Sequence, residues 1–420
     1  MTSDRTGDGR SEGGRRGFLK CAAGLAGVAA AGGVAGQTPA YAAGPALTRG
    51  SNPGGRAIPP DHIPFHGRYQ SGIVTEQQVR AGIVSFDVLA DDRRELIDLF
   101  RTITERARVL VHGLTPKDKT VAAMPATSNS LTLTLGVGAS LFDDRYGLAP
   151  RLPRHLREMP SFPNDDLDPE RCHGDLSLQI GSQHHDVIVH VLHDLAQHTD
   201  GMLRPRWRMD GFLNPSRPTG APRTFVGFKD GISNPDIKSA DVMNRLMWVT
   251  PECDEPDWAV GGCYQVVRLI LFDLDSWDQV DTADQEKIFG RRKGTGAPLD
   301  GKNELDKPDY DADPDGKKIP LGAHIRLANP QTPETADSHF LRRSYNYDGG
   351  FNPDGTLDVG LLFCAYQQDV HRQFAAVQWR LVDEPLSDYV TPVGGGYFFV
   401  LPGVRDSSDW LGSGLLYRRY

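Results

Sequence analysis

In the first half of the chain, stretches with the hydrophobic pattern of a strand are interspersed with stretches that have the pattern of a helix. Apolar residues at 80–88, 131–135 and 175–180 have the spacing and composition of strands. From residue 91 to 110 apolar residues recur every three or four positions, which predicts an amphipathic helix, and a second helix is predicted at 185–197. The order is therefore strand, helix, strand, strand, helix.

The second half of the chain repeats this order. Strands are predicted at 264–273 and 359–366, and each precedes a predicted helix, at 276–289 and 370–381. A repeated set of strands and helices indicates duplicated units. The pattern predicts an α+β fold of two similar units, each an antiparallel sheet with helices on one side.

Residues 1–42 have the features of an export signal. A charged start with the twin arginines Arg15 and Arg16 is followed by an Ala- and Gly-rich run and a small-residue cleavage site at 40–42. We expect export by the twin-arginine translocon to a secreted, extracellular, periplasmic or cell-envelope location. Residues 43–66 are rich in Gly, Pro and Ser, which predicts a flexible N-terminal arm.

Charge and cysteine content narrow the class of function. The 420 residues include 46 basic and 55 acidic residues, for a net charge of −9, which argues against nucleic acid as a partner. Five cysteines in a chain of this length do not make a disulfide scaffold. Cys253 and Cys263 are the closest pair of the mature chain, and the sequence leaves their pairing open.

Three short segments carry residues whose side chains could take part in catalysis or bind a cofactor. Asp230 lies between glycines in GFKDG, His324 lies in HIRLANP, and the adjacent Arg342 and Arg343 lie in LRRSYNY. Taken singly, each has an ordinary structural explanation: an Asp-Gly turn, a hydrogen-bonded histidine, and a pair of arginines of which one faces solvent. Together they supply an acid, an iron ligand and a fixed positive charge, which are the groups needed to split a peroxide on haem.

The chain resembles the dye-decolorizing peroxidases, and within them the exported branch associated with iron uptake, the deferrochelatase/peroxidases. The resemblance runs from about Gly67 to the C-terminus. It rests on segments in family order: LTLTLGVGASLF, GDLSLQI, FVGFKDGISNP, GRRKGTGAPL, HIRLANP, LRRSYNY and GGGYFFVLPGV.

This resemblance implies two ferredoxin-like domains, at 67–225 and 226–420, with one haem b per chain held mostly by the second. It implies that His324 is the proximal iron ligand, Asp230 the distal acid–base group and Arg342 the distal arginine. The haem contacts implied by the family motifs are Gly231, Ile232, Ser233, Asn329, Pro330 and Gln331. The chain departs from the family in having Gln331 where Arg is common, and Ser344 where another branch has Asn.

The implied activity is a haem peroxidase that uses hydrogen peroxide to oxidise dyes, phenolics or ferrous iron. A carboxylate loses its proton at lower pH than an imidazole, so a distal aspartate predicts an acidic pH optimum. The alternatives are a deferrochelatase that releases iron from haem for an uptake system, and a haem carrier without turnover. We also expect self-association into a homo-oligomer.

Four other features receive structural interpretations. The five histidines between 184 and 198 are expected on a solvated helix face, because they lack a zinc-binding pattern. Asp311, Asp313 and Asp315 begin like a calcium loop, but Gly322 stands where Glu is required. GGGYFF at 394–399 lacks the features of a phosphate loop. Electron relay is a possible role for three aromatic residues, but core packing is the expectation for each: Trp379, Tyr397 and Trp410.

Overall fold

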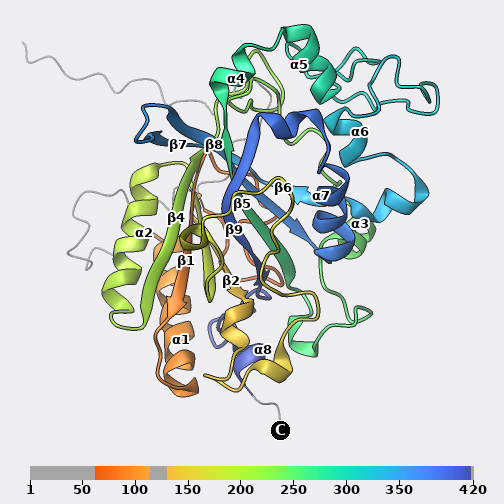
Figure 1. Cartoon of the computed structure of the whole chain (residues 1–420). Coiled ribbons are helices and arrows are strands. Elements are labelled where there is room, and N and C mark those ends of the chain that lie inside the picture. The colour runs from red at the N-terminus through yellow and green to blue at the C-terminus, as the bar shows by residue number, and fades with distance from the viewer. Residues whose placement is uncertain (1–61, 114–129, 418–420) are drawn as a thin grey trace, which may run out of the picture. The chain divides into compact units, whose positions relative to one another are not determined.

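The computed structural model of the chain describes residues 62–113 and 130–417 (Figure 1). The strands are β1 (Arg80–Val88), β2 (Thr132–Gly138), β3 (Leu176–Ser182), β4 (Leu203–Phe212), β5 (Cys263–Phe272), β6 (Leu341–Arg342), β7 (Tyr345–Phe351), β8 (Leu357–Gln367) and β9 (Val390–Val400). The α-helices are α1 (Arg93–Val111), α2 (His185–His198), α3 (Ala240–Leu246), α4 (Leu274–Asp278), α5 (Thr282–Phe289), α6 (His324–Ala328), α7 (Ala376–Arg380) and α8 (Ser413–Leu416).

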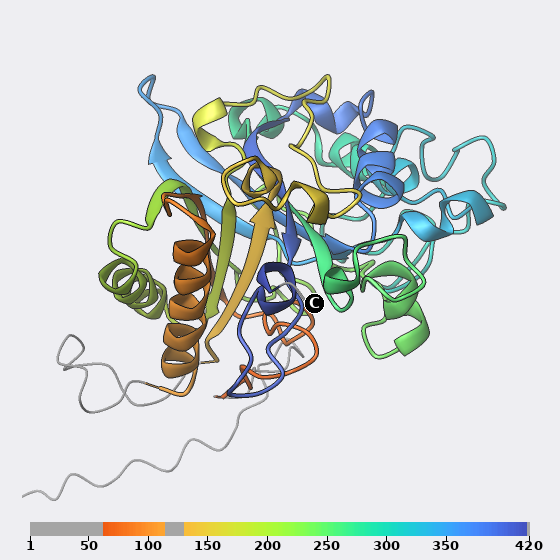
Figure 2. The ribbon, with the colours of Figure 1, turned by 90° about the horizontal axis from the view of Figure 1, so that it is seen from below.

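The first half of the fold contains β1, α1, β2, β3, α2 and β4. Its strands lie in the order β2-β3-β1-β4, and each neighbouring pair is antiparallel. The carboxylate of Asp92 accepts the N–H groups of Arg94 and Glu95 and so caps the start of α1. The apolar stripe of α1 that the sequence predicted is buried, and α1 and α2 lie side by side against this part of the sheet (Figures 1 and 2).

The second half has the same plan. It contains β5, the short helices α4 and α5, β7, β8, a helical segment ending in α7, and β9. Its strands lie in the order β9-β5-β8-β7, so the equivalent strands of both halves occupy equivalent places. Each half is a ferredoxin-like unit, which confirms the predicted duplicated α+β fold.

The two halves share one ring of strands instead of forming two separate sheets. β2 pairs with β9 from Gly136 to Gly138, and β4 meets β7 at the pair Phe212 and Asn346. Because β5 also pairs with β8, the eight longer strands close into a barrel-like arrangement. One apolar cluster draws residues from strands of both halves, among them Ile83, Val267, Tyr345, Tyr366 and Phe398. The halves are therefore packed together through a shared core.

The helices of the second half differ from the prediction. The predicted helix at 276–289 is two helices, because α4 ends at Asp278 and α5 begins only after Asp281. The predicted helix at 370–381 begins as a π-helical turn, His371–Ala375, and continues as α7. Such π-helical turns are rare in proteins, and those that occur are frequently found at functional sites. Apolar periodicity runs across both irregularities, which is why it did not reveal them.

Four strands were missing from the prediction. β4 carries alternating arginines and a proline, and β9 contains three consecutive glycines, both of which are unusual in strands. β7 ends in the glycine-containing sequence DGGF, and β6 is only two residues long. Their place in the sheet comes from pairing with neighbours and not from their own propensity.

The histidine cluster, the aspartate-rich loop and the glycine-rich segment each have an ordinary structural place in the described residues. Of the five histidines on or beside α2, four are exposed and His190 is partly buried. The described ranges contain no group of three or more potential metal ligands. The carboxylate of Asp313 accepts the N–H groups of Lys317, Lys318 and Ile319, and therefore closes a turn. The segment at 394–399 is part of β9.

Two further observations concern the cysteines and membrane insertion. All four cysteines of the described segments are free thiols, so Cys253 and Cys263 are not bridged. In residues 62–113 and 130–417 no helix has the length and apolar character that crossing a bilayer demands. The predicted export signal and most of the predicted arm lie outside the described residues. The predicted domain boundaries at residues 66 and 225 stay predictions.

Candidate functional site

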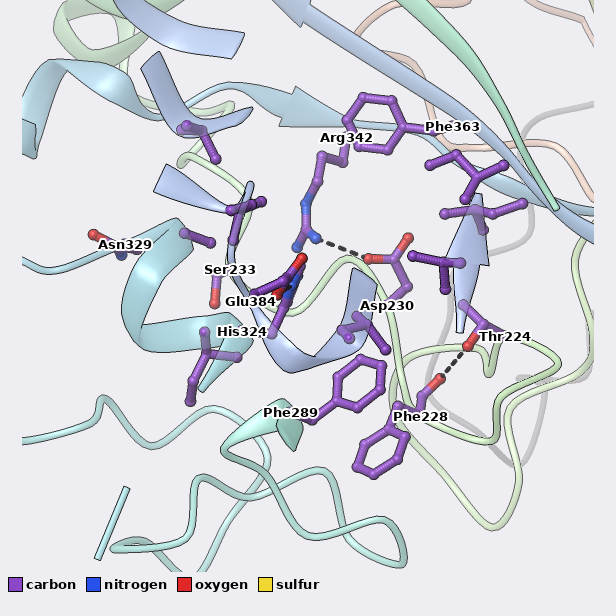
Figure 3. Close-up of a pocket in the computed structure, with 18 of the residues that line it drawn as sticks. Thr224, Phe228, Asp230, Ser233, Phe289, His324, Asn329, Arg342, Phe363 and Glu384 are labelled. Carbon is purple, nitrogen blue, oxygen red and sulfur yellow. Dashed lines mark hydrogen bonds and ion pairs between the residues drawn. The ribbon is translucent and has the colours of Figure 1, made fainter. Parts of the chain in front are cut away.

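His324 is the first residue of α6 and lines a large cavity in the second half of the fold. The cavity contains about 1690 Å³ of space not filled by protein atoms, including the part open to solvent. α6 packs against α5 and α7, which carry other parts of the lining. Phe289, at the end of α5, lies with its ring centre 5.7 Å from that of His324 (Figure 3).

The His324 ring is held by a buried carboxylate. Its Nδ1 lies 2.6 Å from Oε2 of Glu384, whose side chain is only 7% exposed. Burial by itself would lower the pKa of His324, but the charge and hydrogen bond of Glu384 outweigh this, and the pKa is raised. With Nδ1 bound to Glu384, Nε2 is the ring nitrogen left to face the cavity.

Asp230 and Arg342 form an ion pair that also lines this cavity. Nη1 of Arg342 lies 3.0 Å from Oδ1 of Asp230, and the two side chains point toward one another in Figure 3. Both are about one-quarter exposed. Asp230, Arg342 and His324 all line the same cavity. The structure therefore brings together the acid, the cation and the imidazole that the sequence singled out.

The backbone of Arg342 is fastened to the loop that carries Asp230. The side-chain amide of Asn234 donates to the carbonyl of Arg342 and accepts the N–H of the same residue, at 2.9 Å each. Gly231, which lies between Asp230 and Asn234 in the chain, has a φ of +85°, a conformation that favours glycine. Its N–H donates to Oδ1 of Asp230 at 2.7 Å. These bonds fix the separation of the two charged side chains.

A second contact, between Lys229 and Glu304, also supports the loop that carries Asp230. Lys229 forms an ion pair with Glu304, and the side chain of Lys229 is 3% exposed. Oε1 of Glu304 also accepts the N–H of Ala221 at 2.7 Å. The long segment between α5 and α6 therefore holds the loop in place.

The rest of the cavity wall is mostly apolar and aromatic. Phe228 and Phe289 are stacked with ring centres 3.9 Å apart. The other apolar lining residues include Val226, Ile232, Ile270, Phe272, Ile325, Phe340, Leu361, Phe363, Phe374, Val377 and Leu381. Such walls suit a large planar apolar ligand.

The residues present fit the haem b that the sequence predicted. A histidine nitrogen facing an apolar cavity is a donor for haem iron. Haem b also carries two carboxylates, and the lining contains a buried cation, Arg291, whose Nη2 donates to Oγ of Ser233 at 3.5 Å. Burial lowers the pKa of Arg291, so a nearby carboxylate would stabilise its charge. His324 would hold the iron, and Arg291 with Ser233 would hold a carboxylate.

The predicted site residues fall into three groups. Six line this cavity: Asp230, Ile232, Ser233, His324, Asn329 and Arg342. Gly231 lines a second, adjoining cavity. Pro330 and Gln331 are not among the lining residues of either cavity, and the amide of Gln331 donates to the carbonyl of Pro308 at 3.1 Å. Gln331, which stands where the family commonly has Arg, therefore binds the loop that contains Pro308.

Several residues of the site were not predicted. Glu384 follows His324 by 60 residues, and no local motif connects them. Asn234 lies within the quoted segment FVGFKDGISNP, which was the available signal. Trp379 also departs from the expectation of core packing, because it is 59% exposed, whereas Trp410 and Tyr397 are buried as expected.

Comparison with known proteins assigns the family. The C-terminal model of the Dyp-type peroxidases matches residues 221–405, and the N-terminal model matches residues 70–213. Deferrochelatases from Escherichia coli O6:K15:H31 and from Shigella sonnei are each 47% identical over 367 residues, covering 84% of this chain and 87% of theirs.

Solved structures agree with these matches. A DyP-type peroxidase from Cellulomonas bogoriensis is 35% identical, with a TM-score of 0.78 over 87% of this chain and 99% of its own. An oxyferrous complex of DtpA from Streptomyces lividans is 34% identical, with a TM-score of 0.78 over 89% of this chain and 100% of its own. These findings confirm the predicted fold class, the haem-dependent peroxidase class and haem b as the cofactor. The chain belongs to the Dyp-type peroxidase family.

Proposed function

We propose that Asp230 is the acid–base group and Arg342 the charge-stabilising group of the peroxidase reaction, with His324 as the iron ligand. One observation carries the proposal. The Asp230–Arg342 ion pair and the Glu384-bound His324 line the same apolar cavity. A carrier that only binds haem has no need of a paired acid and cation beside the histidine.

The proposed roles follow from the chemistry of hydrogen peroxide. When bound, haem b would supply the iron and the electrons for reduction of the peroxide, and His324 would hold that iron. The Asp230 carboxylate takes the proton from the inner oxygen and delivers it to the outer oxygen, which leaves as water. The guanidinium of Arg342 stabilises the negative charge that develops on the leaving oxygen. Glu384 holds the proton of Nδ1 and keeps the His324 ring oriented.

Bulky reductants such as dyes would give up electrons at the surface. Trp379 is exposed, and its neighbours Val377 and Gln378 line the cavity. Its ring centre lies 5.3 Å from that of Phe162, which lies 6.2 Å from Phe374 in the cavity wall. Trp379 is therefore an accessible aromatic group close to the cofactor cavity.

Release of iron from haem is a second candidate function. The observation that favours it is the 47% identity to proteins named deferrochelatase. The two functions differ in their products, because iron release leaves a metal-free porphyrin. Incubation of the haem-loaded protein followed by porphyrin fluorescence tests this. Metal-free porphyrin supports iron release, and intact haem after peroxide turnover excludes it.

The location of the protein and its partners are also proposals. Arg15 and Arg16 support export by the twin-arginine translocon, and the exported protein would serve an iron-uptake system. Replacing both arginines by lysine should retain the protein inside the cell. Export unchanged by that substitution would contradict the proposal. Size-exclusion chromatography with light scattering tests the proposed homo-oligomer.

Substitution of Asp230 tests the catalytic proposal. Asp230→Asn should slow the peroxide-induced change of the haem Soret band about 10²- to 10⁴-fold in stopped-flow experiments, with normal haem content. Asp236→Asn, an exposed change in the same loop, is the matched control. His324→Ala should instead give protein lacking the Soret band. Unchanged kinetics in Asp230→Asn would refute the assigned role.

A further inference from the structure

His339 is a second imidazole in the wall of the haem cavity, and the proposed reaction does not use it. It lies between the 3₁₀ helix Pro333–Ser338 and β6, and both His339 and Ser338 line the cavity. The side-chain amide of Gln373, in the π-helical turn, donates to the backbone carbonyl of His339. This bond fixes the backbone and leaves the imidazole ring free for other contacts.

The ring of His339 forms no hydrogen bond with any residue of 62–113 or 130–417. The residue is only partly exposed. Shielded polar groups are ordinarily hydrogen-bonded, as Nδ1 of His324 is to Glu384. A polar side chain that lines a cavity and has no partner within the described chain is available to a ligand, so the ring of His339 can donate a hydrogen bond to an acceptor in the cavity.

Four of the charges that act on His339 are positive, which favours an anionic acceptor. Burial lowers the pKa of His339 in the haem-free chain, and four cations lower it further: Arg245, Lys307, Arg342 and Arg380. Arg380 donates to the carbonyls of Leu327 and Ala328, at 3.0 and 3.1 Å, and forms no ion pair within the described ranges. An anionic group in the cavity would offset this positive charge.

The basic side chains of the cavity wall show which anion fits. Five line the haem cavity: Lys229, Arg291, His324, His339 and Arg342. Three of them are bound to carboxylates, in the pairs Lys229–Glu304, His324–Glu384 and Arg342–Asp230. Arg291 and His339 have no carboxylate partner among the residues that the structure describes. Two basic groups are thus available, and haem b brings two carboxylates.

Position 331 does not supply a further positive charge. Gln331 is neutral, its amide donates to the carbonyl of Pro308 at 3.1 Å, and it is not among the residues that line the haem cavity. Arg291 with Ser233 can hold one haem carboxylate. The other carboxylate therefore needs a partner from elsewhere in the wall.

We propose that the ring of His339 donates a hydrogen bond to the second haem carboxylate, the one that Arg291 and Ser233 do not hold. A ring N–H is the donor and a carboxylate oxygen the acceptor. The contact would retain the cofactor and set its orientation in the cavity. It does not depend on the catalytic role of Asp230.

Loss of haem from the holoenzyme tests this contact. His339→Leu should speed the transfer of haem b to an excess of a haem-scavenging protein about tenfold, because a hydrogen bond to a charged group is lost. The matched probe is the dimethyl ester of haem b, which has no charged carboxylate. It should leave the wild type and His339→Leu at nearly equal rates. His193→Leu, the same change at an exposed position on α2, should alter neither rate.

Resonance Raman spectra of the ferric holoenzyme report on the carboxylates directly. The bending vibration of the haem carboxylate side chains depends on their hydrogen bonds. His339→Leu should shift this band, and His339→Gln, which keeps an N–H donor, should lie closer to the wild type. His193→Leu should leave the band in place. An unchanged Soret band in the same samples shows that the iron ligand is intact.

Selective acceleration of haem b transfer together with a shifted carboxylate band supports the contact. Equal acceleration of haem b and its ester shows a general loosening of the wall and overturns it, as does an unshifted band or an unchanged rate for haem b. If His339→Leu does not retain haem at all, His339→Gln gives the same comparison with both porphyrins. Normal peroxide kinetics in Asp230→Asn would refute the proposed reaction and leave these results standing.

Discussion

Oε2 of Glu384 lies 2.6 Å from Nδ1 of His324, although 60 residues separate them in the chain. The contact joins the first residue of α6 to the residue that precedes a short 3₁₀ helix, Pro385–Asp388. A charged acceptor at this nitrogen fixes the tautomer and makes the other nitrogen a stronger donor to a metal. The proximal side of the site is therefore set by two residues and not by the histidine alone.

Glu384→Gln should weaken the hold of the protein on haem. The substitution keeps a hydrogen-bonding side chain but removes the charge, and loss of such partners typically costs 10- to 100-fold in metal affinity or activity. The measurement is the rate of haem transfer to an excess of a haem-scavenging protein. Asp383→Asn, at the exposed neighbouring position, is the control. Equal transfer rates in Glu384→Gln and wild type would contradict the role.

Asn234→Leu should slow the reaction with peroxide about tenfold while haem content stays normal. The change removes both hydrogen bonds to the Arg342 backbone and frees the arginine to move from Asp230. Asn234→Asp keeps the acceptor and should lie between the leucine variant and wild type. Stopped-flow Soret kinetics give the comparison, and identical rates for Asn234→Leu and Asn234→Asp would argue against positioning through these bonds.

Trp379→Phe should lower turnover of a bulky dye several-fold without changing the rate of the peroxide step. Phenylalanine preserves the contact with Phe162 but is far harder to oxidise than tryptophan. Tyr417→Phe alters another exposed aromatic residue and serves as control. Steady-state dye oxidation and stopped-flow kinetics are compared on the same preparations. Unaltered dye turnover in Trp379→Phe would exclude this residue as an electron entry point.

Asp165→Asn should reduce the free energy of unfolding by about 3–5 kcal/mol. Asp165 pairs with Arg268, and the side chains are 0% and 1% exposed. Removal of the carboxylate charge leaves the guanidinium buried without a counter-ion, and its Nε and Nη1 already lack hydrogen-bond partners in the described residues. Urea unfolding gives the value, with the exposed Asp200→Asn as control. A loss below 1 kcal/mol would show that Arg268 finds another partner.

The contribution of His339 to stability should fall as the pH drops below about 6.5, the usual pKa of histidine. Burial lowers the pKa of His339, and the nearby cations Arg245, Lys307, Arg342 and Arg380 lower it further. At this residue the unfolded chain then binds more protons than the folded chain, so the stability contributed by His339 rises with pH through this window and is lost on acidification. His339→Gln should flatten the dependence of Tm on pH between 7.5 and 5.5. His193→Gln, at an exposed position, should retain the wild-type slope.

Local pattern was sufficient for much of the fold. The apolar stripe of residues 91–110 and the alternation at 131–135 correspond to α1 and β2, because amphipathic periodicity is a property of neighbouring residues. The same holds for the acid, the histidine and the arginine, since each stands in a short segment whose residue types suggested its chemistry. That these three residues lie in one site was a hypothesis based on the resemblance to the dye-decolorizing peroxidases.

The tertiary structure decided what depends on distant contacts. β9 is a strand because β2 and β5 flank it, despite three glycines, and closure of the ring depends on that pairing. Glu384, which follows α7 in the chain, reaches His324 because α6 and α7 pack together. The sequence alone determined the repeated α+β pattern and the three chemical groups. Only the folded chain determined their distances, the carboxylate behind His324 and the second cavity, because these arise from packing between segments far apart in sequence.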